Sequence, residues 1–104
     1  MAFQFTDENV KETIASGKLA VVDCWATWCG PCVRMSPIID EVAEEFGDKA
    51  VIGKYNVDEN SDLSAEYRIM SIPTILFFKD GKLVDRLAGS QSKATLDAKI
   101  NSLL

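Results

Sequence analysis

Histidine is absent from this chain of 104 residues, and cysteine and proline each occur only three times. The lack of histidine excludes a Cys–His catalytic pair, a histidine metal ligand and the usual side-chain pH switch. Structural zinc would have to take three cysteines and a carboxylate as its ligands, so we expect no metal site. Because the number of cysteines is odd, a small secreted scaffold held together by disulfides is also disfavoured.

Positive charge and long apolar runs are scarce as well. The chain has 11 Lys+Arg against 16 Asp+Glu, a formal net charge of -5. No basic field is therefore available to attract a phosphate backbone, and we expect no nucleic-acid partner. No segment approaches the roughly 18 apolar residues of a membrane helix, and the first twenty residues contain Asp7, Glu8 and Glu12, unlike a secretory signal. We therefore expect a cytoplasmic protein with no membrane partner.

The apolar pattern predicts one domain, residues 1–104, in which strands alternate with helices. A hydrophobic fraction of 47% is that of an ordinary packed globule. The alternation implies parallel pairing, while Asp80 and Gly81 form a two-residue hairpin signal that implies an antiparallel end to the sheet. Predicted strands occupy residues 3–5, 19–25, 50–57, 74–79 and 83–87, and predicted helices lie between Thr6 and Gly17, from Pro31 to Gly47, around 63–67 and after Ser92.

The predicted helix that follows Pro31 carries two further backbone predictions. Its apolar residues recur at helical spacing from Met35 to Phe46, and Gly47 stands where a left-handed C-terminal residue belongs. Pro37 lies inside this pattern and removes one backbone donor. Since the periodicity continues beyond Pro37, we expect a kink there and no break.

Two of the three cysteines lie close together in the segment Trp28-Cys29-Gly30-Pro31-Cys32, where a predicted strand gives way to a helix. A disulfide needs Cα atoms roughly 4.4 to 6.8 Å apart, and residues i and i+3 of a first helical turn are near neighbours. Pro31 is tolerated at a helix start, and Gly30 leaves the approach to the first sulfur open. We therefore predict a reversible disulfide with an exposed Cys29. The alternatives are a zinc ligand pair or two small buried hydrophobic residues.

Asp23 interrupts the otherwise apolar strand at 19–25. Desolvation raises the pKa of a fully buried carboxyl by up to about 3 to 5 units, which would make Asp23 a proton acceptor near neutral pH. The alternative is an edge-strand residue that faces water. Successive strand residues face opposite sides, so the third cysteine, Cys24, should point away from Asp23 as a core residue, with a regulatory thiol as the other reading.

Several motifs follow one another in a characteristic order along the chain. Residues 22–37 surround Trp-Cys-Gly-Pro-Cys, residues 71–74 read Ser-Ile-Pro-Thr before a strand, Asp80-Gly81 marks the hairpin, and Gly89 precedes the last helix. A lone C-x-x-C also occurs in zinc sites, but this combination resembles the thioredoxin family over essentially the whole chain. The resemblance implies the thioredoxin fold, an α/β fold with a central mixed five-stranded sheet flanked by four helices.

The resemblance also implies an activity, that of a general protein-disulfide reductase. In the family pattern Cys29 attacks a substrate disulfide and Cys32 then attacks Cys29 to release the reduced product. Asp23 matches the family's general base or acid for the resolving thiol, and Lys54 matches a lysine that lies near this carboxyl, the alternative being a solvated strand lysine. The implied protein is a monomer without cofactor, which is itself re-reduced by thioredoxin reductase, an NADPH-dependent flavoprotein.

A docking surface for protein disulfides is implied by the same resemblance. Pro73 matches the family's cis-proline, and the Ile72 backbone would pair with an extended substrate segment, a mode that tolerates many sequences. Trp25 would support the site from the core, while core packing is the alternative for Trp28. The apolar rim around Cys29 is expected to comprise Trp28, Gly30, Pro31, Ile72, Pro73, Ala88 and Gly89.

Two positions depart from the family pattern. Val33 follows the second cysteine where thioredoxins usually have Lys, although Arg34 is adjacent, and Cys24 replaces a usual Phe. Partner preference and redox tuning are the properties that these changes would affect.

Competing functions are a non-catalytic module that binds partners through the same rim, and an oxidant or isomerase on the same fold. The Gly-Pro pair between the cysteines resembles the reducing branch.

Overall fold

Ten elements follow one another along residues 1–104, all of which are described by a computed structural model. Their order confirms the predicted alternation of strands and helices. The strands are β1 (Phe3–Phe5), β2 (Ala20–Trp25), β3 (Val51–Asn56), β4 (Thr74–Lys79) and β5 (Lys82–Ala88). The helices are α1 (Asp7–Ala15), α2 (Gly30–Phe46), α3 (Asp62–Glu66) and α4 (Lys93–Leu103), with a 3-10 turn, η1 (Gly47–Lys49), after α2.

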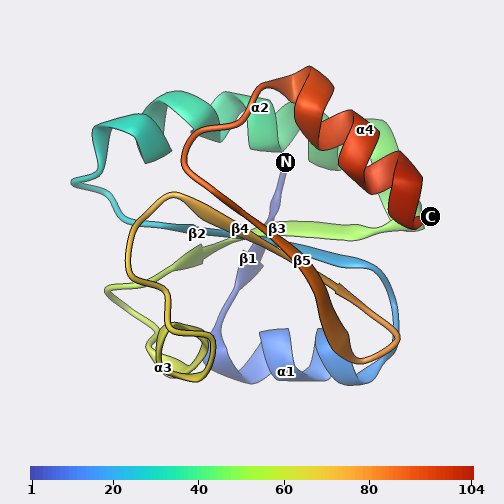
Figure 1. Cartoon of the computed structure of the whole chain (residues 1–104), viewed down its shortest axis with the longest axis horizontal. Coiled ribbons are helices and arrows are strands. Elements are labelled where there is room, and N and C mark those ends of the chain that lie inside the picture. Colours follow the sequence, from blue (N-terminus) through green and yellow to red (C-terminus); the bar gives the residue numbers. More distant parts are fainter.

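The strands form one mixed sheet in the order β1-β3-β2-β4-β5. The β1, β3 and β2 strands run parallel, whereas β4 and β5 run antiparallel to their neighbours. Helices α2 and α4 cover one face of the sheet, and α1 and α3 cover the other (Figure 1). The predicted fold class, a five-stranded mixed sheet with four helices, is thereby confirmed.

Local signals account for two of the element boundaries and for the continuity of α2. The Thr6 hydroxyl accepts the backbone N–H of Asn9, and the Asn9 side chain accepts the backbone N–H of Thr6, which forms a capping box at the start of α1. Asp80 and Gly81 both have positive φ angles, 55° and 82°, as a tight hairpin between twisted strands requires. The α2 helix continues through Pro37 without a break, as the periodicity predicted.

The end of α2 differs from the prediction. Gly47 has φ 53° and ψ -124°, so its φ is positive but its ψ lies outside the left-handed helical region. Only glycine adopts such a backbone readily. The reason is the chain's path, because a 3-10 turn follows at once and leads directly into β3. The sequence pattern did not predict this turn.

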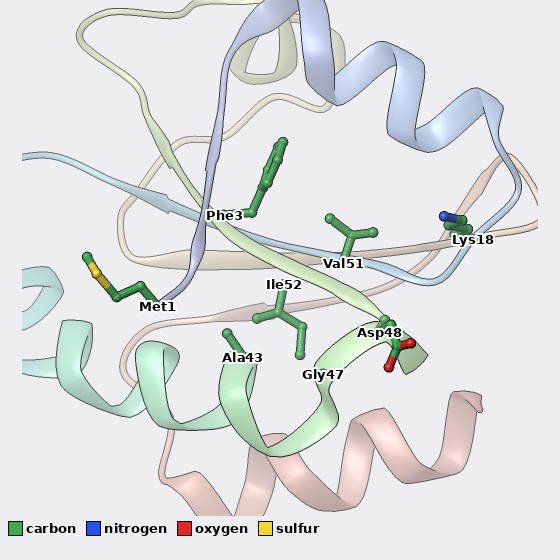
Figure 2. A pocket seen from close by; sticks show the side chains of 9 residues that line it. Met1, Phe3, Lys18, Ala43, Gly47, Asp48, Val51 and Ile52 are labelled. Carbon is green, nitrogen blue, oxygen red and sulfur yellow. The ribbon is translucent and has the colours of Figure 1, made fainter.

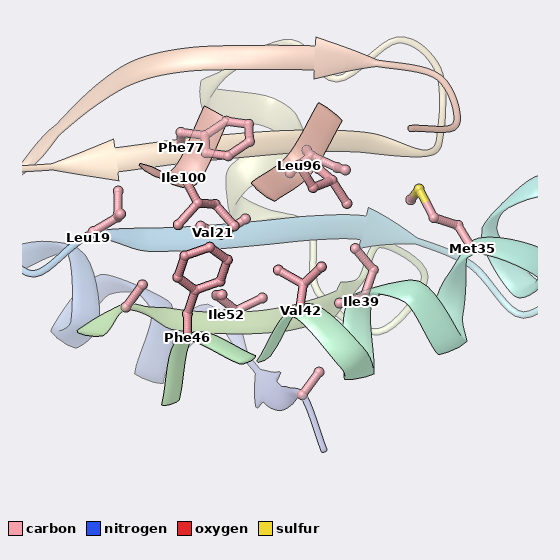
Figure 3. Packing of buried hydrophobic residues seen from close by; sticks show 13 residues of the cluster. Leu19, Val21, Met35, Ile39, Val42, Phe46, Ile52, Phe77, Leu96 and Ile100 are labelled. Carbon is pink, nitrogen blue, oxygen red and sulfur yellow. The ribbon is translucent and has the colours of Figure 1, made fainter. Parts of the chain in front are cut away.

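The alternation of side chains along the strands divides the core into two layers. One layer lies between the sheet and helices α2 and α4, where Val21 and Ile52 meet Val42, Phe46 and Ile100 (Figure 3). The other layer faces α1 and α3 and contains Val22, Tyr55, Leu63 and Phe78 together with the fully buried Cys24. Cys24 therefore points away from the α2 side, as its place beside Asp23 predicted.

Candidate redox site

Cys29 is the N-cap residue of α2, and its sulfur is bonded to that of Cys32 as a disulfide, with the two Cα atoms 5.2 Å apart. The Cys29 Sγ accepts the backbone N–H of Cys32 at 3.2 Å. This sulfur thus occupies the place that a Ser or Asp oxygen takes in an ordinary helix cap. A helix N-terminus stabilises a negative charge by about 0.3 to 1 kcal/mol, so the cap favours a thiolate at Cys29 when the disulfide is opened.

The predicted exposure of Cys29 is wrong. Cys29 is only 5% exposed, and Cys32 is 1% exposed. Both pack with Ala26 against Trp25 and against Val57 and Ile72, the last two of which come from distant segments of the chain. Of the two cysteines, Cys29 is the more accessible.

Asp23 lies on β2, between β3 and β4 at the centre of the sheet. It is 1% exposed, which excludes the alternative of an edge-strand residue facing water, and its Oδ1 has no hydrogen-bond partner. Burial raises the pKa of Asp23 to about 7, and the positive charge of Lys54 opposes this rise. The carboxyl group therefore exchanges its proton near neutral pH.

Lys54 stands directly opposite Asp23 in the parallel β2–β3 register. It is buried, so the reading of a solvated strand lysine does not hold. Its ammonium, however, does not form an ion pair with Asp23. The Nζ donates to the Ser36 hydroxyl at 2.5 Å and lies 3.1 Å from the Asp40 carboxylate, both on α2.

The loop before β4 forms a wall beside the disulfide. The Ile72–Pro73 peptide bond is cis, and the Ile72 carbonyl oxygen lies 3.9 Å from Cys29 Sγ. The Pro73 carbonyl accepts the backbone N–H of Gly89 at 2.8 Å, which ties this loop to the end of β5. Pro73 itself is buried, whereas Ile72 is partly exposed and Ala88 and Gly89 are exposed.

The first turn of α2 also borders the disulfide. Gly30 and Pro31 are exposed there, and Val33 is exposed at the position where the family pattern has a cation. This side of the site therefore combines small and apolar groups with one cation, because the exposed Arg34 places its guanidinium beside Gly30.

Trp28 is 70% exposed, so it is not a core residue. Its indole Nε1 donates to the Asp58 carboxylate at 2.7 Å, which fixes the ring at the edge of a groove of about 340 Å³. Trp25 is half-buried against the cysteines, and its Nε1 has no partner. The groove is lined by Trp28, Val57, Ile69, Met70, Ser71 and Ile72.

Sequence reasoning missed Ile69 and Met70. Met70 is almost fully exposed, and Ile69 packs against the core beneath it. Both directly precede the Ser-Ile-Pro-Thr motif, and that adjacency is the signal that could have found them. Their apolar side chains line the groove outside the predicted rim.

A second hollow, of about 280 Å³, lies beside β1 and the end of α2. Figure 2 shows Met1, Phe3, Ala43 and Val51 around it, with Lys18 and Asp48 at its border. It contains no cysteine and no buried carboxyl group, so it is separate from the redox chemistry.

No group of three or more metal-ligating side chains is arranged to hold an ion. None of the helices combines the length and apolarity that crossing a membrane would require.

The family model described as Thioredoxin matches residues 1–102. The chain belongs to the thioredoxin family. In this thioredoxin domain the paired cysteines at the start of α2 are a dithiol–disulfide couple, and the chain is a protein-disulfide oxidoreductase.

Curated thioredoxins agree over nearly the whole chain. Thioredoxin of Chlorobaculum thiosulfatiphilum is 44% identical over 100 residues, which cover 95% of this chain and 93% of that protein. Thioredoxin 2 of Chlorobaculum tepidum is 45% identical over 100 residues, with 95% and 92% covered. Thioredoxin of Alicyclobacillus acidocaldarius is 44% identical over 99 residues, with 95% and 94% covered.

Proposed function

We propose that the chain is a general protein-disulfide reductase in which Cys29 is the nucleophile and Cys32 the resolving thiol. The observation that carries this assignment is the hydrogen bond from the Cys32 backbone N–H to Cys29 Sγ at the N-terminus of α2. This bond and the helix dipole favour a thiolate at Cys29. Cys29 is also the less buried of the two.

The reaction proceeds by two exchanges at sulfur. The Cys29 thiolate attacks one sulfur of a substrate disulfide, forms a mixed disulfide and releases the other sulfur as a thiolate. The Cys32 thiol then loses its proton and attacks Cys29 Sγ, which forms the Cys29–Cys32 disulfide and releases the second substrate sulfur. Two electrons thereby pass from the dithiol to the substrate, and the released thiolates take up protons.

Asp23 acts in this proposal as the proton acceptor for the Cys32 thiol. A general base works best when its pKa lies near the working pH, and burial raises the pKa of Asp23 to about 7. Its Oδ1 has no partner in the oxidised protein and is therefore free to receive a proton. Lys54, opposite Asp23 on β3, and Trp25, which packs against the cysteines, act as supporting residues.

Substrates dock on the surface between Trp28 and the Ile72–Pro73 loop. An extended segment would pair with the Ile72 main chain, and its side chains would enter the groove beside Trp28. Gly30, Pro31, Ala88 and Gly89 present little side-chain bulk near the disulfide. Recognition through main chain and apolar contact is consistent with a broad range of protein substrates.

The cellular setting belongs to the same proposal. We infer a cytoplasmic monomer that requires no bound cofactor and is re-reduced by thioredoxin reductase, an NADPH-dependent flavoprotein. Membership of the thioredoxin family supports a reductase partner. The surface around Cys29 that serves protein disulfides would serve this partner too.

The direction of the reaction is tested by the reduction of insulin. With dithiothreitol as electron donor, the protein should precipitate insulin faster than dithiothreitol alone, and its reduction potential should lie near the roughly -270 mV of thioredoxin rather than the roughly -120 mV of a strong oxidant. A potential close to the oxidising value, together with no acceleration, would support the oxidant alternative. The double variant Cys29→Ser, Cys32→Ser should be inactive.

The order of attack predicts a trapped intermediate. Cys32→Ser should accumulate mixed disulfides with protein substrates, because Cys29 still attacks but nothing resolves the product. Mass spectrometry after non-reducing separation should place the link at Cys29. The same adducts should form when Cys24→Ala is added, and they should vanish in Cys29→Ser, Cys32→Ser. Adducts at Cys24, or none at all, would contradict the assignment.

The Trp28–Asp58 hydrogen bond predicts a modest effect on substrate docking. Asp58→Ala removes the acceptor of the Trp28 indole, and one hydrogen bond of this kind is worth about 0.5 to 1.5 kcal/mol. We expect the KM for a protein disulfide to rise by about 2- to 10-fold with kcat retained, accompanied by a change in tryptophan fluorescence. Glu59→Ala, which alters the adjacent exposed carboxylate, is the control. Equal KM values for the two variants would mean that the bond does not position Trp28 for docking.

A further inference from the structure

Lys54 has two carboxylates on its side of the sheet and is bonded to only one of them. Residues two apart in a strand face the same side of the sheet. Lys54 therefore faces the same side as Ile52, and Asp23 the same side as Val21, which is the side covered by α2. Opposite residues of adjacent strands lie about 4.8 Å apart in the hydrogen-bonding direction. Lys54 nevertheless forms its ion pair with Asp40, at 3.1 Å, and donates to Ser36 at 2.5 Å.

Asp40 is itself held in place from a third element. The backbone N–H of Ala2, just before β1, donates to Asp40 Oδ1 at 3.0 Å. This bond lowers the pKa of Asp40, burial opposes it, and Lys54 and the amino group of Met1 lower it further. Asp40 is therefore ionised at neutral pH and competes with Asp23 for the ammonium of Lys54.

We propose that Asp40 and Ser36 are positioning residues for the reaction: by holding the Lys54 ammonium toward α2, they prevent it from pairing with Asp23 and so keep that carboxyl group available to the resolving thiol. The inference rests on the proposed function, in which Asp23 receives the proton of Cys32. It explains why a buried lysine faces a buried carboxyl in register while no ion pair joins them.

The other groups around Asp23 do not offer an alternative control. Ile75 faces it from β4, and α4 contributes apolar Leu96 and Ile100 to this layer. The Cys24 thiol lies next to it on β2 but faces the other layer, and α2 contributes the disulfide and Asp40. Lys54 is accordingly the charge that lowers the pKa of Asp23. How strongly it does so depends on how firmly Asp40 and Ser36 keep its ammonium toward α2.

The inference predicts how the pKa of Asp23 responds when the hold is released. In Asp40→Asn the amide oxygen still accepts the Ala2 N–H, but the charge that retains Lys54 is gone. We expect the ammonium to turn toward Asp23 and the pKa of Asp23 to fall by about one pH unit. Ser36→Ala, which changes no charge, should lower it by less. Glu45→Gln, which removes a carboxylate on α2 that pairs with Lys93, is the matched control and should leave it unchanged.

The measurement is an NMR titration of the Asp23 carboxyl carbon in the oxidised protein, in which Cys29 and Cys32 do not titrate. If Asp40 acts by holding Lys54, Asp40→Asn should no longer change the pKa of Asp23 when Lys54→Met is also present. A shift that persists in full without Lys54 would overturn the inference, since it would come from the charge of Asp40 alone. An unchanged pKa of Asp23 in both Asp40→Asn and Ser36→Ala would overturn it as well.

The kinetics separate this inference from the proposed function. If Asp23 accepts the proton, the acid limb of the rate at which Cys32 resolves a mixed disulfide should move down by the same pH interval as the pKa of Asp23. A pKa that moves while the rate profile stays fixed would show that Asp40 and Ser36 hold Lys54 away from Asp23, but it would contradict the role of Asp23 in the reaction. A fixed pKa would contradict the positioning role whatever the rate does.

Discussion

Asp23→Asn should stabilise the protein by about 4 kcal/mol at pH 8 and by little or nothing at pH 3. The wild-type carboxyl has an ordinary pKa of 3.8 in the unfolded chain, and burial raises it to about 7 in the folded protein. Between these values the folded state keeps a proton that the unfolded state releases, so stability falls as the pH rises from about 4 to about 7 and the full cost is present above that range. Each pKa unit corresponds to about 1.4 kcal/mol.

Urea unfolding at a series of pH values measures this effect. The wild-type free energy of unfolding should decline between pH 4 and pH 7 relative to that of Asp23→Asn, because an amide does not ionise. Asp48→Asn, which alters an exposed carboxyl group in η1, is the control and should follow the wild type. If the difference between Asp23→Asn and the wild type were the same at pH 3 and pH 8, Asp23 would not carry a raised pKa.

Gly53→Ala should destabilise the protein by about 2 to 3 kcal/mol through overpacking in the sheet. Gly53 is buried in β3, in register with Phe3 on one side and Val22 on the other. A Cβ atom there would lie 2.5 Å from the Phe3 carbonyl oxygen and 2.7 Å from ring atoms of Phe5. A backbone atom in a paired strand cannot move aside, so β1 would have to shift away from β3.

The comparison variant is Gly30→Ala. The nearest group to a Cβ at Gly30 is the Arg34 guanidinium at 3.2 Å, the far end of a flexible side chain, so its stability should change by about 0.5 kcal/mol or less. Urea unfolding measures both variants, and hydrogen exchange of the β1 amides should rise only in Gly53→Ala. Equal stability of the two variants would show that β1 accommodates the methyl group without loss.

Local patterns predicted the elements well, because the forces behind them act over a few residues. Thr6 and Ser92 precede helices at the predicted places and cap them, since each side chain accepts the backbone N–H of the residue three positions later. The Asp80-Gly81 hairpin depends on backbone angles that few residues adopt. The end of α2 at Gly47 was predicted in the wrong conformation, because the following turn into β3 decides its ψ angle.

The redox site was predictable only in part. The proximity of Cys29 and Cys32 follows from their spacing at the start of a helix, and the anomaly of Asp23 is visible in an apolar strand. The burial of Cys29 was not predictable, because Val57 and Ile72 come from distant segments and pack around it. The groove residues Ile69 and Met70 were missed for another reason, since no periodic pattern marks a loop and only their place before the Ser-Ile-Pro-Thr motif pointed to them.

The sequence by itself determined the order of the elements, the mixed sheet and the two cysteines that form the couple. The reason is that cysteine spacing, turn chemistry and hydrophobic periodicity depend only on residues close to one another in the chain. Only the tertiary structure decided the state of the groups around that couple. The pKa of Asp23 depends on how completely the sheet and α2 exclude water from it. The choice of Lys54 between Asp23 and Asp40 depends on distances between β3 and α2 that no stretch of sequence encodes.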